Sequence, residues 1–204
     1  HLHCLELATG AELWSLACGG KDVDSTACAV GDHAFVGAED THLYCLDRDG
    51  GVVWRYATGG SVESSPAVWD GKVYIGSYDG YLHCVDAADG APRWRFPTGD
   101  DTDSSPVIVD GRAHVGCENG FLYCLDARTG ERIWRRRAGA GIWGTPYVGD
   151  DKVIVGADDA FVHAFSAEGD SLWRADVGAG MWASPTVVDG VVVIGDWDGV
   201  LHGL

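Results

Sequence analysis

The 204-residue sequence has no long hydrophobic run and little that marks a leader segment. No stretch approaches the roughly 18 apolar residues of a membrane-spanning helix, so we expect no membrane insertion from this segment. The first residues lack the basic start and apolar block of a secretory signal, and the sequence does not open on Met, so we interpret His1 as a cut end. The localisation is therefore unknown from the residues themselves.

Basic residues are scarce. The sequence holds 14 Lys and Arg against 31 Asp and Glu, a formal net charge of -17. This charge repels nucleic acid and argues against it as a partner. Lysine occurs only as Lys21, Lys72 and Lys152, and Asp outnumbers Glu, a composition that we associate with salt-loving organisms. We interpret it as a solvated, halophilic surface that salt screens, with specific cation binding as the alternative.

Helical periodicity is also absent, since no window shows apolar residues at a spacing of 3.6. Instead, the sequence repeats. Five tryptophans are spaced 40, 40, 40 and 39 residues apart: Trp14, Trp54, Trp94, Trp134 and Trp173. Within one period, Asp70-Gly71 and Asp79-Gly80 separate short β-branched and aromatic runs, which is a strong hairpin signal. The four strands expected there are Pro66 to Trp69, Lys72 to Ser77, Tyr81 to Asp86 and Arg93 to Phe96.

Four strands in each 40-residue repeat predict an all-β fold, a β-propeller of four-stranded antiparallel blades with about five repeats. Stacked solenoids are the rival architecture, but their usual repeats are helical or shorter. We expect one domain over residues 1–204. It would comprise a partial blade at 1–16, full blades at 25–57, 65–97, 105–137 and 145–175, and a partial blade at 184–204.

The segment between the third and fourth strands carries a family resemblance. Cys84-x-Asp86-x-x-x-Gly90-x-x-x-Trp94 resembles the tryptophan-docking motif Ala-x-Asp-x-x-Thr-Gly-x-x-x-Trp of pyrroloquinoline quinone (PQQ)-type repeats. The copies that end in Trp14 and Trp134 keep this spacing, whereas those that end in Trp54 and Trp173 are one residue shorter. Trp-Asp does not end a strand in every repeat, as it would in the other large propeller class. The chain thus resembles the PQQ-like (BamB-like) β-propeller repeat family over its whole length.

The resemblance implies a seven- or eight-bladed ring, of which this chain would form an arc. A closed five-bladed ring is the alternative, and it would require Pro185 to Gly195 to pair with the N-terminal strands. The resemblance favours a non-catalytic scaffold that binds a protein or peptide partner, or a small ligand, in the cell envelope or another extracytoplasmic place. A sensor domain of a larger signalling protein and a PQQ- and Ca²⁺-dependent quinoprotein dehydrogenase are the alternatives.

The sequence departs from the dehydrogenase branch in two ways. It has no adjacent cysteines, which the resemblance would lead one to expect beside the cofactor, and no set of acids that matches that branch's calcium and catalytic-base motif. We therefore expect no catalytic residue, no metal ligand and no cofactor, with PQQ and Ca²⁺ kept as the alternative.

The docking motif predicts that each tryptophan buries its indole against a small residue of the next blade. We assign that role to the residue that opens each motif: Cys4, Cys45, Cys84, Cys124 and Ala164. Equivalent cysteines on neighbouring blades would lie roughly 10 Å apart, too far for a disulfide. His3, His83, His163 and His202 share one repeat position that also accepts tyrosine, and no partner repeats beside them, so we interpret them as structural.

The loops that precede each conserved-spacing proline differ between blades. Aligned on the proline, two loops carry an acid, Glu63 or Asp103, where the next two carry Trp143 and Trp182. Asp24, in the preceding loop, continues the acidic set. These loops share one face with the turns between second and third strands, which add Tyr78, Asp79, Asp196, Trp197 and Asp198. We expect a partly acidic, partly aromatic mouth for a cationic or amphipathic ligand or a peptide, with Asp24, Glu63, Asp103, Trp143, Trp182 and Trp197 as binding residues. Plugging of the channel by Trp143 and Trp182 is the alternative.

Overall fold

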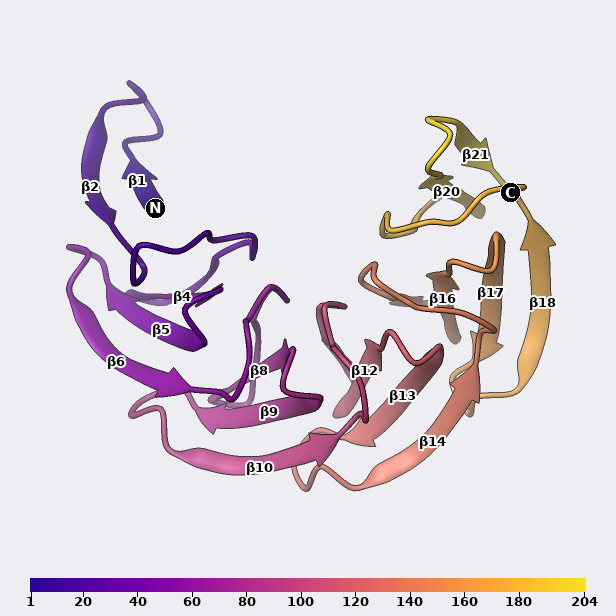
Figure 1. The fold of residues 1–204 in the computed structure, drawn as a ribbon, viewed down its shortest axis with the longest axis horizontal. Coiled ribbons are helices and arrows are strands. Elements are labelled where there is room, and N and C mark those ends of the chain that lie inside the picture. The colour runs from indigo at the N-terminus through magenta and orange to yellow at the C-terminus, as the bar shows by residue number, and fades with distance from the viewer.

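The computed structural model describes all residues from 1 to 204 and contains 21 strands in six antiparallel sheets, with no helix. Figure 1 shows the sheets following one another along an arc, with β6, β10, β14 and β18 on its outer side. The first sheets comprise β1 (Leu2–Leu5) and β2 (Glu12–Leu16); β3 (Cys28–Val30), β4 (His33–Ala38), β5 (His42–Asp47) and β6 (Val52–Ala57); and β7 (Ala67–Trp69), β8 (Lys72–Ser77), β9 (Tyr81–Asp86) and β10 (Pro92–Pro97).

The remaining sheets continue the same order. They comprise β11 (Val107–Val109), β12 (Arg112–Gly116), β13 (Phe121–Asp126) and β14 (Arg132–Arg137); β15 (Tyr147–Gly149), β16 (Lys152–Gly156), β17 (Phe161–Ser166) and β18 (Ser171–Asp176); and β19 (Thr186–Val188), β20 (Val191–Gly195) and β21 (Leu201–Gly203). Each sheet is a meander in which neighbours in sequence pair in space. The predicted all-β architecture of four-stranded antiparallel blades is confirmed.

Tight turns explain the meander. The Asp70-Gly71 turn between β7 and β8 has φ of 49° and 70°, as a type I′ hairpin turn requires. Asp110 and Gly111 repeat this geometry between β11 and β12, with φ of 49° and 74°. The third and fourth strands instead pair with a register shift just before each docking tryptophan, for example between Pro92 and Trp94. This bulge bends the outer strand.

The docking tryptophans tie each blade to the next. The indole Nε1–H of Trp54 donates to the carbonyl of Ala87 at 3.1 Å, and that of Trp94 donates to the carbonyl of Ala127 at 3.1 Å. Trp14 and Trp134 make the same bond to Arg48 and Ala167, at 2.9 and 3.0 Å. Each indole lies on a glycine of the next blade. A Cβ added to that glycine would come within 2.6 to 2.8 Å of the ring, at Gly50, Gly90, Gly130 and Gly169.

The glycine corrects our assignment of the docking surface to cysteine. Cys84 lies opposite Trp94 in the same sheet, and Cys124 lies opposite Trp134. Residues directly opposite in an antiparallel pair project to the same side, so the thiol packs beside its own blade's indole and does not receive the preceding blade's. Cys4, Cys45 and Ala164 stand likewise opposite Trp14, Trp54 and Trp173. Glycine at the docking position leaves space for the indole ring, so that its N–H reaches the backbone carbonyl in the same turn of the next blade.

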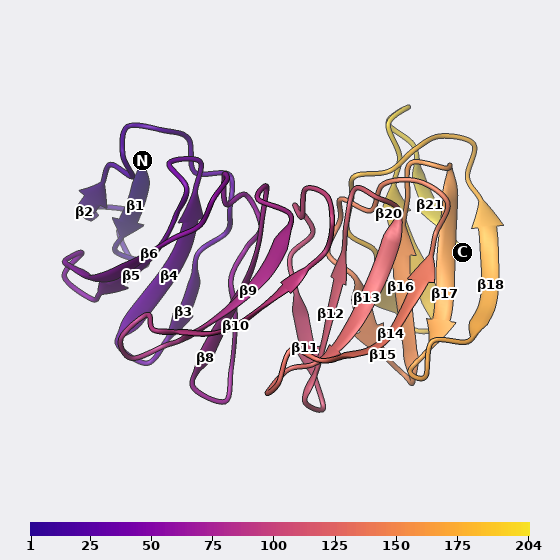
Figure 2. The same ribbon diagram turned by 60° about the horizontal axis from the view of Figure 1, so that its bottom comes forward.

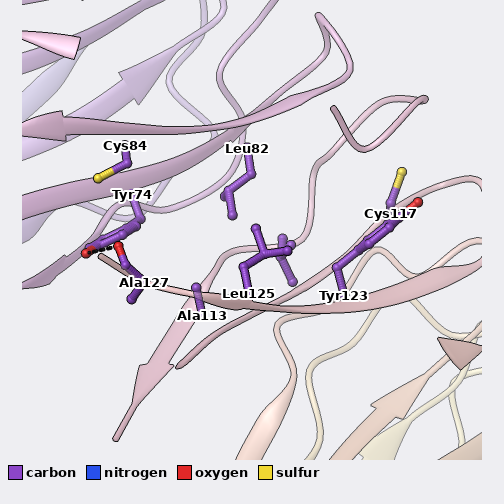
Figure 3. Close-up of a cluster of buried hydrophobic side chains, with 9 residues drawn as sticks. Tyr74, Leu82, Cys84, Ala113, Cys117, Tyr123, Leu125 and Ala127 are labelled. Carbon is purple, nitrogen blue, oxygen red and sulfur yellow. Dashed lines mark hydrogen bonds between the residues drawn. The ribbon is translucent and has the colours of Figure 1, made fainter. Parts of the chain in front are cut away.

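The core consists of separate layers between blades. Figure 3 shows one of them, in which Tyr74, Leu82 and Cys84 of one blade face Ala113 and Leu125, among others, of the next. The Tyr74 hydroxyl crosses this layer and donates to the carbonyl of Ala127 at 3.0 Å. All seven cysteines are unpaired thiols. Burial raises the pKa of Cys84 and Cys124 to about 12, so both stay protonated at neutral pH and fill space as small apolar groups.

The two ends of the arc do not join. Strands β19 and β20 pair with each other and with β21, and no ladder connects them to β1 or β2. Figure 1 shows the first and last sheets apart from each other. The closed five-bladed ring, the alternative that required Pro185 to Gly195 to pair with the N-terminal strands, does not occur. The structure contains no helix of the length and hydrophobicity needed to cross a bilayer.

Candidate functional site

Loops and turns gather at one end of the blades. In a four-stranded meander, the turn between strands two and three lies at the same end as the loop that leads to the next blade, as Figure 2 shows from the side. We call this end the loop face. A backbone hydrogen bond joins turn and loop in every blade. The N–H of Tyr78 donates to the carbonyl of Ser61 at 2.9 Å, and that of Glu118 donates to the carbonyl of Asp101 at 3.1 Å.

Buried hydroxyls hold several of these loops. The Ser64 Oγ accepts from the N–H of Gly76 at 2.7 Å and donates to its carbonyl at 3.1 Å. The next residue, Ser65, donates its N–H to the Oγ of Ser105, one blade further on, at 2.8 Å. A loop fixed to its own second strand and to its neighbour presents its remaining side chains in fixed positions.

Those side chains form pairs. In each blade, one member of the pair is the first residue of the turn, whose N–H makes the backbone hydrogen bond described above. The other member lies in the loop, two residues after the residue whose carbonyl accepts that bond. Five such pairs follow one another, and we call them the loop-face strip: Asp24 with Glu39, Glu63 with Tyr78, Asp103 with Glu118, Trp143 with Asp158, and Trp182 with Trp197. All six binding residues predicted from the sequence fall within this strip. Their role in binding remains a prediction.

Two carboxyl groups in the acidic part of the strip, those of Glu63 and Asp103, have raised pKa values. The Tyr78 hydroxyl donates to Glu63 at 2.8 Å, yet burial, together with Asp24 and Glu39, still raises the pKa of Glu63. Burial, followed by the charges of Glu63 and Asp24, raises the pKa of Asp103 to about 6. Ionisation is disfavoured where like charges lie close together and are partly removed from water. A positively charged partner would therefore stabilise the ionised forms of these carboxylates.

Glu118 connects the acidic part to the aromatic part. Burial, and then the neighbouring acids Asp101 and Asp100, raise its pKa to about 7, and Asp158 contributes to the same shift. The Trp143 indole N–H donates to Asp158 Oδ2 at 2.7 Å, while Oδ1 of that carboxylate is buried without a hydrogen-bond partner. A carboxylate with one unsatisfied oxygen therefore lies directly beside the indoles.

Three indoles form the aromatic part. The ring of Trp182 lies 5.2 Å from that of Trp143 and 5.1 Å from that of Trp197, the second pair in an edge-on arrangement at 84°. Trp182 and Trp197 are 57% and 55% exposed, which is unusual for so large an apolar side chain. Exposed indole faces bind apolar groups and cations.

Sequence reasoning missed three members of the strip, namely Glu39, Glu118 and Asp158. A signal was present, because each follows by two residues the glycine that ends or nearly ends the second strand, as Tyr78 and Trp197 do. The sequence interpretation included only the two aromatic residues at this position, Tyr78 and Trp197. The aligned position, and not the residue type, identifies the strip.

Two predicted members of the mouth have structural roles. Asp79 accepts the N–H of Gly59 at 2.9 Å and lies 3.0 Å from the Nε2 of His83, while Asp196 lies 2.7 Å from the Nε2 of His202. Asp159 stands in the same relation to His163, at 3.0 Å. The histidines therefore do have a repeated partner, contrary to our reading of the sequence. The contact between Asp and His fixes the conformation of the turn, which agrees with the structural interpretation of these histidines.

The donor groups of the loop face do not fit a PQQ and Ca²⁺ site. No group of three or more His, Cys, Asp or Glu side chains is placed to hold a metal ion, although the strip contains several carboxylates. Glu63 is bonded to Tyr78, and the Asp158 oxygen that lacks a partner is buried beside an indole. Ca²⁺ needs six to eight oxygen ligands, which this arrangement does not gather.

Six sheets with a repeated indole contact between neighbours define this protein as one built from β-propeller blades. The chain belongs to the PQQ-like repeat family whose model is described as outer membrane protein assembly factor BamB, and that model matches residues 1–101 and 78–204. The sequence resemblance to this family is confirmed.

Two curated relatives represent two branches. The chain is 30% identical over 98 residues to outer membrane protein assembly factor BamB of Yersinia pestis, covering 43% of this chain and 25% of that protein. It is 33% identical over 82 residues to quinohemoprotein alcohol dehydrogenase ADH-IIG of Pseudomonas putida, covering 34% of this chain and 11% of the relative. The matches thus span a quarter or less of the length of these relatives.

Solved structures show the same fold. BamB from Moraxella catarrhalis superposes with a TM-score of 0.60 at 24% identity, over 98% of this chain and 74% of that one. Quinohemoprotein alcohol dehydrogenase from Comamonas testosteroni superposes with a TM-score of 0.75 at 20% identity, over 90% of this chain and 41% of that one. Identities this low establish the propeller fold and leave the function to the site.

Proposed function

We propose that this chain is a non-catalytic interaction scaffold of the BamB-like type, and that its loop-face strip binds a basic, partly apolar segment of a protein partner. The observation that carries the proposal is the one-sided charge of the strip. The loops 58–66, 98–106, 138–146 and 177–185 and the turns 78–80, 117–120, 157–160 and 196–200 contain no Lys or Arg. The first loop, which carries Asp24, contains Lys21 as its one basic residue. Burial, and after it the neighbouring acids, raises the pKa of Asp103 and of Glu118, which is consistent with that imbalance.

A basic partner would relieve this repulsion. A Lys or Arg near Glu63 and Asp103 favours their ionised forms, and an apolar or cationic side chain can cover Trp182 and Trp197. Family membership supports a protein partner and a place in the cell envelope, since the BamB relatives are named for outer membrane protein assembly. Antiparallel blades with fixed loops suit such binding, because the loops lose little conformational entropy when the partner binds.

A peptide titration tests the proposal. The probe is a short peptide that alternates Arg with Leu, and the comparison peptide replaces Arg by Glu. Calorimetry should detect only the Arg peptide. The double variant Glu63→Gln/Asp103→Asn should weaken its binding at least about tenfold, because two charge-assisted contacts are lost. Trp143→Ala/Trp182→Ala, shown by circular dichroism to remain folded, should weaken it as well.

The matched control is Asp49→Asn/Asp170→Asn. It makes the same change in net charge in the turns at the opposite end of the blades, where both side chains are exposed. We expect this variant to bind as the parent does. Equal loss in both double variants would reduce the effect to overall charge, and unchanged affinity in the strip variants would overturn the proposal.

The dehydrogenase alternative has a separate test. Addition of PQQ with Ca²⁺ to the purified chain should leave the cofactor's absorbance unchanged and support no dye reduction with alcohols or sugars. Turnover above the rate without protein would replace the scaffold proposal by an enzymatic one.

A further inference from the structure

The few basic residues of the chain are unevenly distributed. Six of the 14 lie between positions 112 and 137: Arg112, Arg128, Arg132, Arg135, Arg136 and Arg137. Four of these occupy the six-residue strand β14, on the outer side of the arc (Figure 1). In a chain with a net charge of -17, such a concentration needs an explanation.

Comparison between blades explains Arg112, which stands where the neighbouring blades carry Lys72 and Lys152, and Arg135. The outer strands carry Arg at the position of Arg135 four times, and in three of them, Arg95, Arg135 and Arg174, the guanidinium stacks on an aromatic ring of the third strand. Arg135 lies 4.7 Å from the centre of the Phe121 ring, as Arg95 does from Tyr81. Arg135 is therefore a packing residue, held by a cation–π contact.

Arg132 and Arg136 have no such precedent. The position of Arg132 holds Val52, Pro92 or Ser171 in the other full blades, and that of Arg136 holds Tyr56, Phe96 or Ala175. At the position of Arg136 the other full blades carry a partly buried apolar or aromatic side chain, and at that of Arg132 an exposed uncharged one, whereas this blade presents guanidinium groups. Arg136 donates through Nε to the carbonyl of Gly169 and through a terminal nitrogen to the carbonyl of Arg135 at 2.8 Å, which leaves its other terminal nitrogen free. Its guanidinium lies 6.0 Å from the ring of Trp134.

These side chains line a groove between this blade and the next. The groove has a volume of about 470 Å³, and Arg112, Arg132, Arg135, Arg136 and Trp134 form its walls, with Glu168 as its carboxylate. Arg112 donates to the carbonyl of Ala167 at 2.8 Å and lies 3.9 Å from Glu168. Arg132 and Arg136 have no carboxylate within ion-pair distance. We call this space the arginine groove.

A second cavity of about 400 Å³ adjoins the groove and shares Arg112 and Glu168 with it. Lys152 and three aspartates, Asp110, Asp150 and Asp151, also line this cavity. It reaches His114, which is 2% exposed. Neither ring nitrogen has a hydrogen-bond partner of good geometry, and the backbone of Val107 is the polar group that lies against the ring. One blade earlier the same position holds Tyr74, whose hydroxyl is satisfied by the carbonyl of Ala127. Buried polar atoms without a partner are costly and rare, so this one points to a polar occupant.

We propose that the arginine groove binds a small organic anion through a phosphate or carboxylate group, with Arg112, Arg132 and Arg136 as donors and His114 as a contact for the remainder of the ligand. The planar guanidinium group matches both oxyanions with two parallel hydrogen bonds. The combined space suits a small molecule. A polyanion is disfavoured, because the overall charge repels it at long range, whereas one oxyanion needs only the local field.

The site is independent of the proposed function. Strand β14 begins at the end of the blade opposite the loop face, and Glu168 lies in the turn between strands three and four at that same end. Loss of one activity would therefore leave the other intact.

The test is a titration followed by ¹H–¹⁵N NMR on the full chain. The probes are inorganic phosphate, glycerol 3-phosphate and citrate, with glycerol as the neutral comparison, all at one ionic strength. We expect saturable shifts of the Trp134 indole N–H and the Arg136 Nε–H with the three anions and none with glycerol. Arg132→Gln/Arg136→Gln should weaken binding at least about tenfold, and Arg136→Lys, which keeps the charge but loses the fork, should weaken it measurably.

The matched control is Arg95→Gln/Arg174→Gln, which removes two stacked arginines that do not line the groove and leaves the expected affinity unchanged. Equal weakening in this control, or no saturable shift with any anion, would overturn the proposal. Binding to phosphatidylglycerol vesicles without a response to the soluble anions would overturn the assignment of a small ligand.

Discussion

At the scale of single residues, the contact between blades depends on glycine. The ring of Trp94 lies where a Cβ at Gly130 would be, 2.6 Å from a ring carbon, and Gly130 has a φ of 75°. Two demands therefore meet at one position, a left-handed backbone and the absence of a side chain. The motif in the sequence shows the spacing of Gly and Trp, but not that they belong to neighbouring blades.

Replacement of this glycine separates the two demands. Gly130→Ala should destabilise the protein by about 2 to 4 kcal/mol, because the backbone strain and the displaced indole both contribute. Gly71→Ala is the control, since Gly71 has a φ of 70° and open space around it. Urea unfolding should give only the backbone part, about 1 to 2 kcal/mol, for Gly71→Ala. Equal losses for the two variants would contradict the role assigned to the contact.

His114 should make stability depend on pH. Burial lowers its pKa to about 4, from about 6.5. Between these values the unfolded chain binds the proton more strongly, so the contribution of His114 to stability falls as the pH drops from 6.5 towards 4. His114→Phe, which copies Phe35 of an earlier blade, should remove that dependence and raise the free energy of unfolding by about 2 to 3 kcal/mol at pH 4.5. The pH dependence of the difference between parent and variant in urea unfolding checks this, and a flat difference would contradict it.

Residue types alone misled us about partners. His83 and His163 looked unaccompanied in sequence, yet each has an Asp four positions earlier in contact with its ring. A spacing of four across a tight turn brings side chains together here, a geometry that is familiar in helices and easily overlooked in hairpins. The interpretation of these histidines as structural rested on their having no repeated partner, and the structure shows that they have one. The contact with Asp at the turn supports the same interpretation for a different reason.

At the scale of elements, the strands follow from local chemistry. Lys72–Ser77 and Tyr81–Asp86 have the bounds predicted from alternation and Asp-Gly turns. The first strand starts at Ala67 and not at Pro66, and the fourth extends to Pro92–Pro97. Proline cannot donate to a ladder, so it occurs at strand ends. The arginine groove was not predictable, because the direction of Arg132 depends on the bulge before Trp134.

The loop-face strip should respond to neutralisation of one acid. The pKa of Asp103 rises to about 6 from 3.8, through burial and then the charges of Glu63 and Asp24. The folded chain therefore binds this proton more strongly than the unfolded chain, and stability falls as the pH rises from about 4 through 6. Asp103→Asn should recover about 1 to 2 kcal/mol at pH 7.5, after allowance for solvent screening, and nothing at pH 3.5.

Asp170→Asn is the comparison for this prediction, because Asp170 is exposed in a turn at the other end of a blade. Thermal unfolding at the two pH values should show the gain for Asp103→Asn alone. A gain of the same size for Asp170→Asn would attribute the effect to net charge.

At the scale of the whole molecule, the charges separate along the blades. The loop face gathers acids and indoles, with Lys21 in the first loop as its basic side chain, whereas the arginine groove opens at the other end of β14. A basic peptide and a small anion would thus meet fields of opposite sign on one rigid body. Because each blade contacts only its neighbours, either site can change without altering the other.

The same nearest-neighbour logic predicts how stability is distributed along the arc. Trp134 is 6% exposed and docks on Gly169, whereas Trp173 is 37% exposed and has no glycine packed against its ring. Trp134→Ala should therefore cost about 3 to 5 kcal/mol, and Trp173→Ala much less. Trp94→Ala, in a fully flanked blade, should match Trp134→Ala. Calorimetric unfolding of the three variants measures this, and a loss for Trp173→Ala as large as that for Trp134→Ala would show that blade contacts are not the source of the indole's contribution.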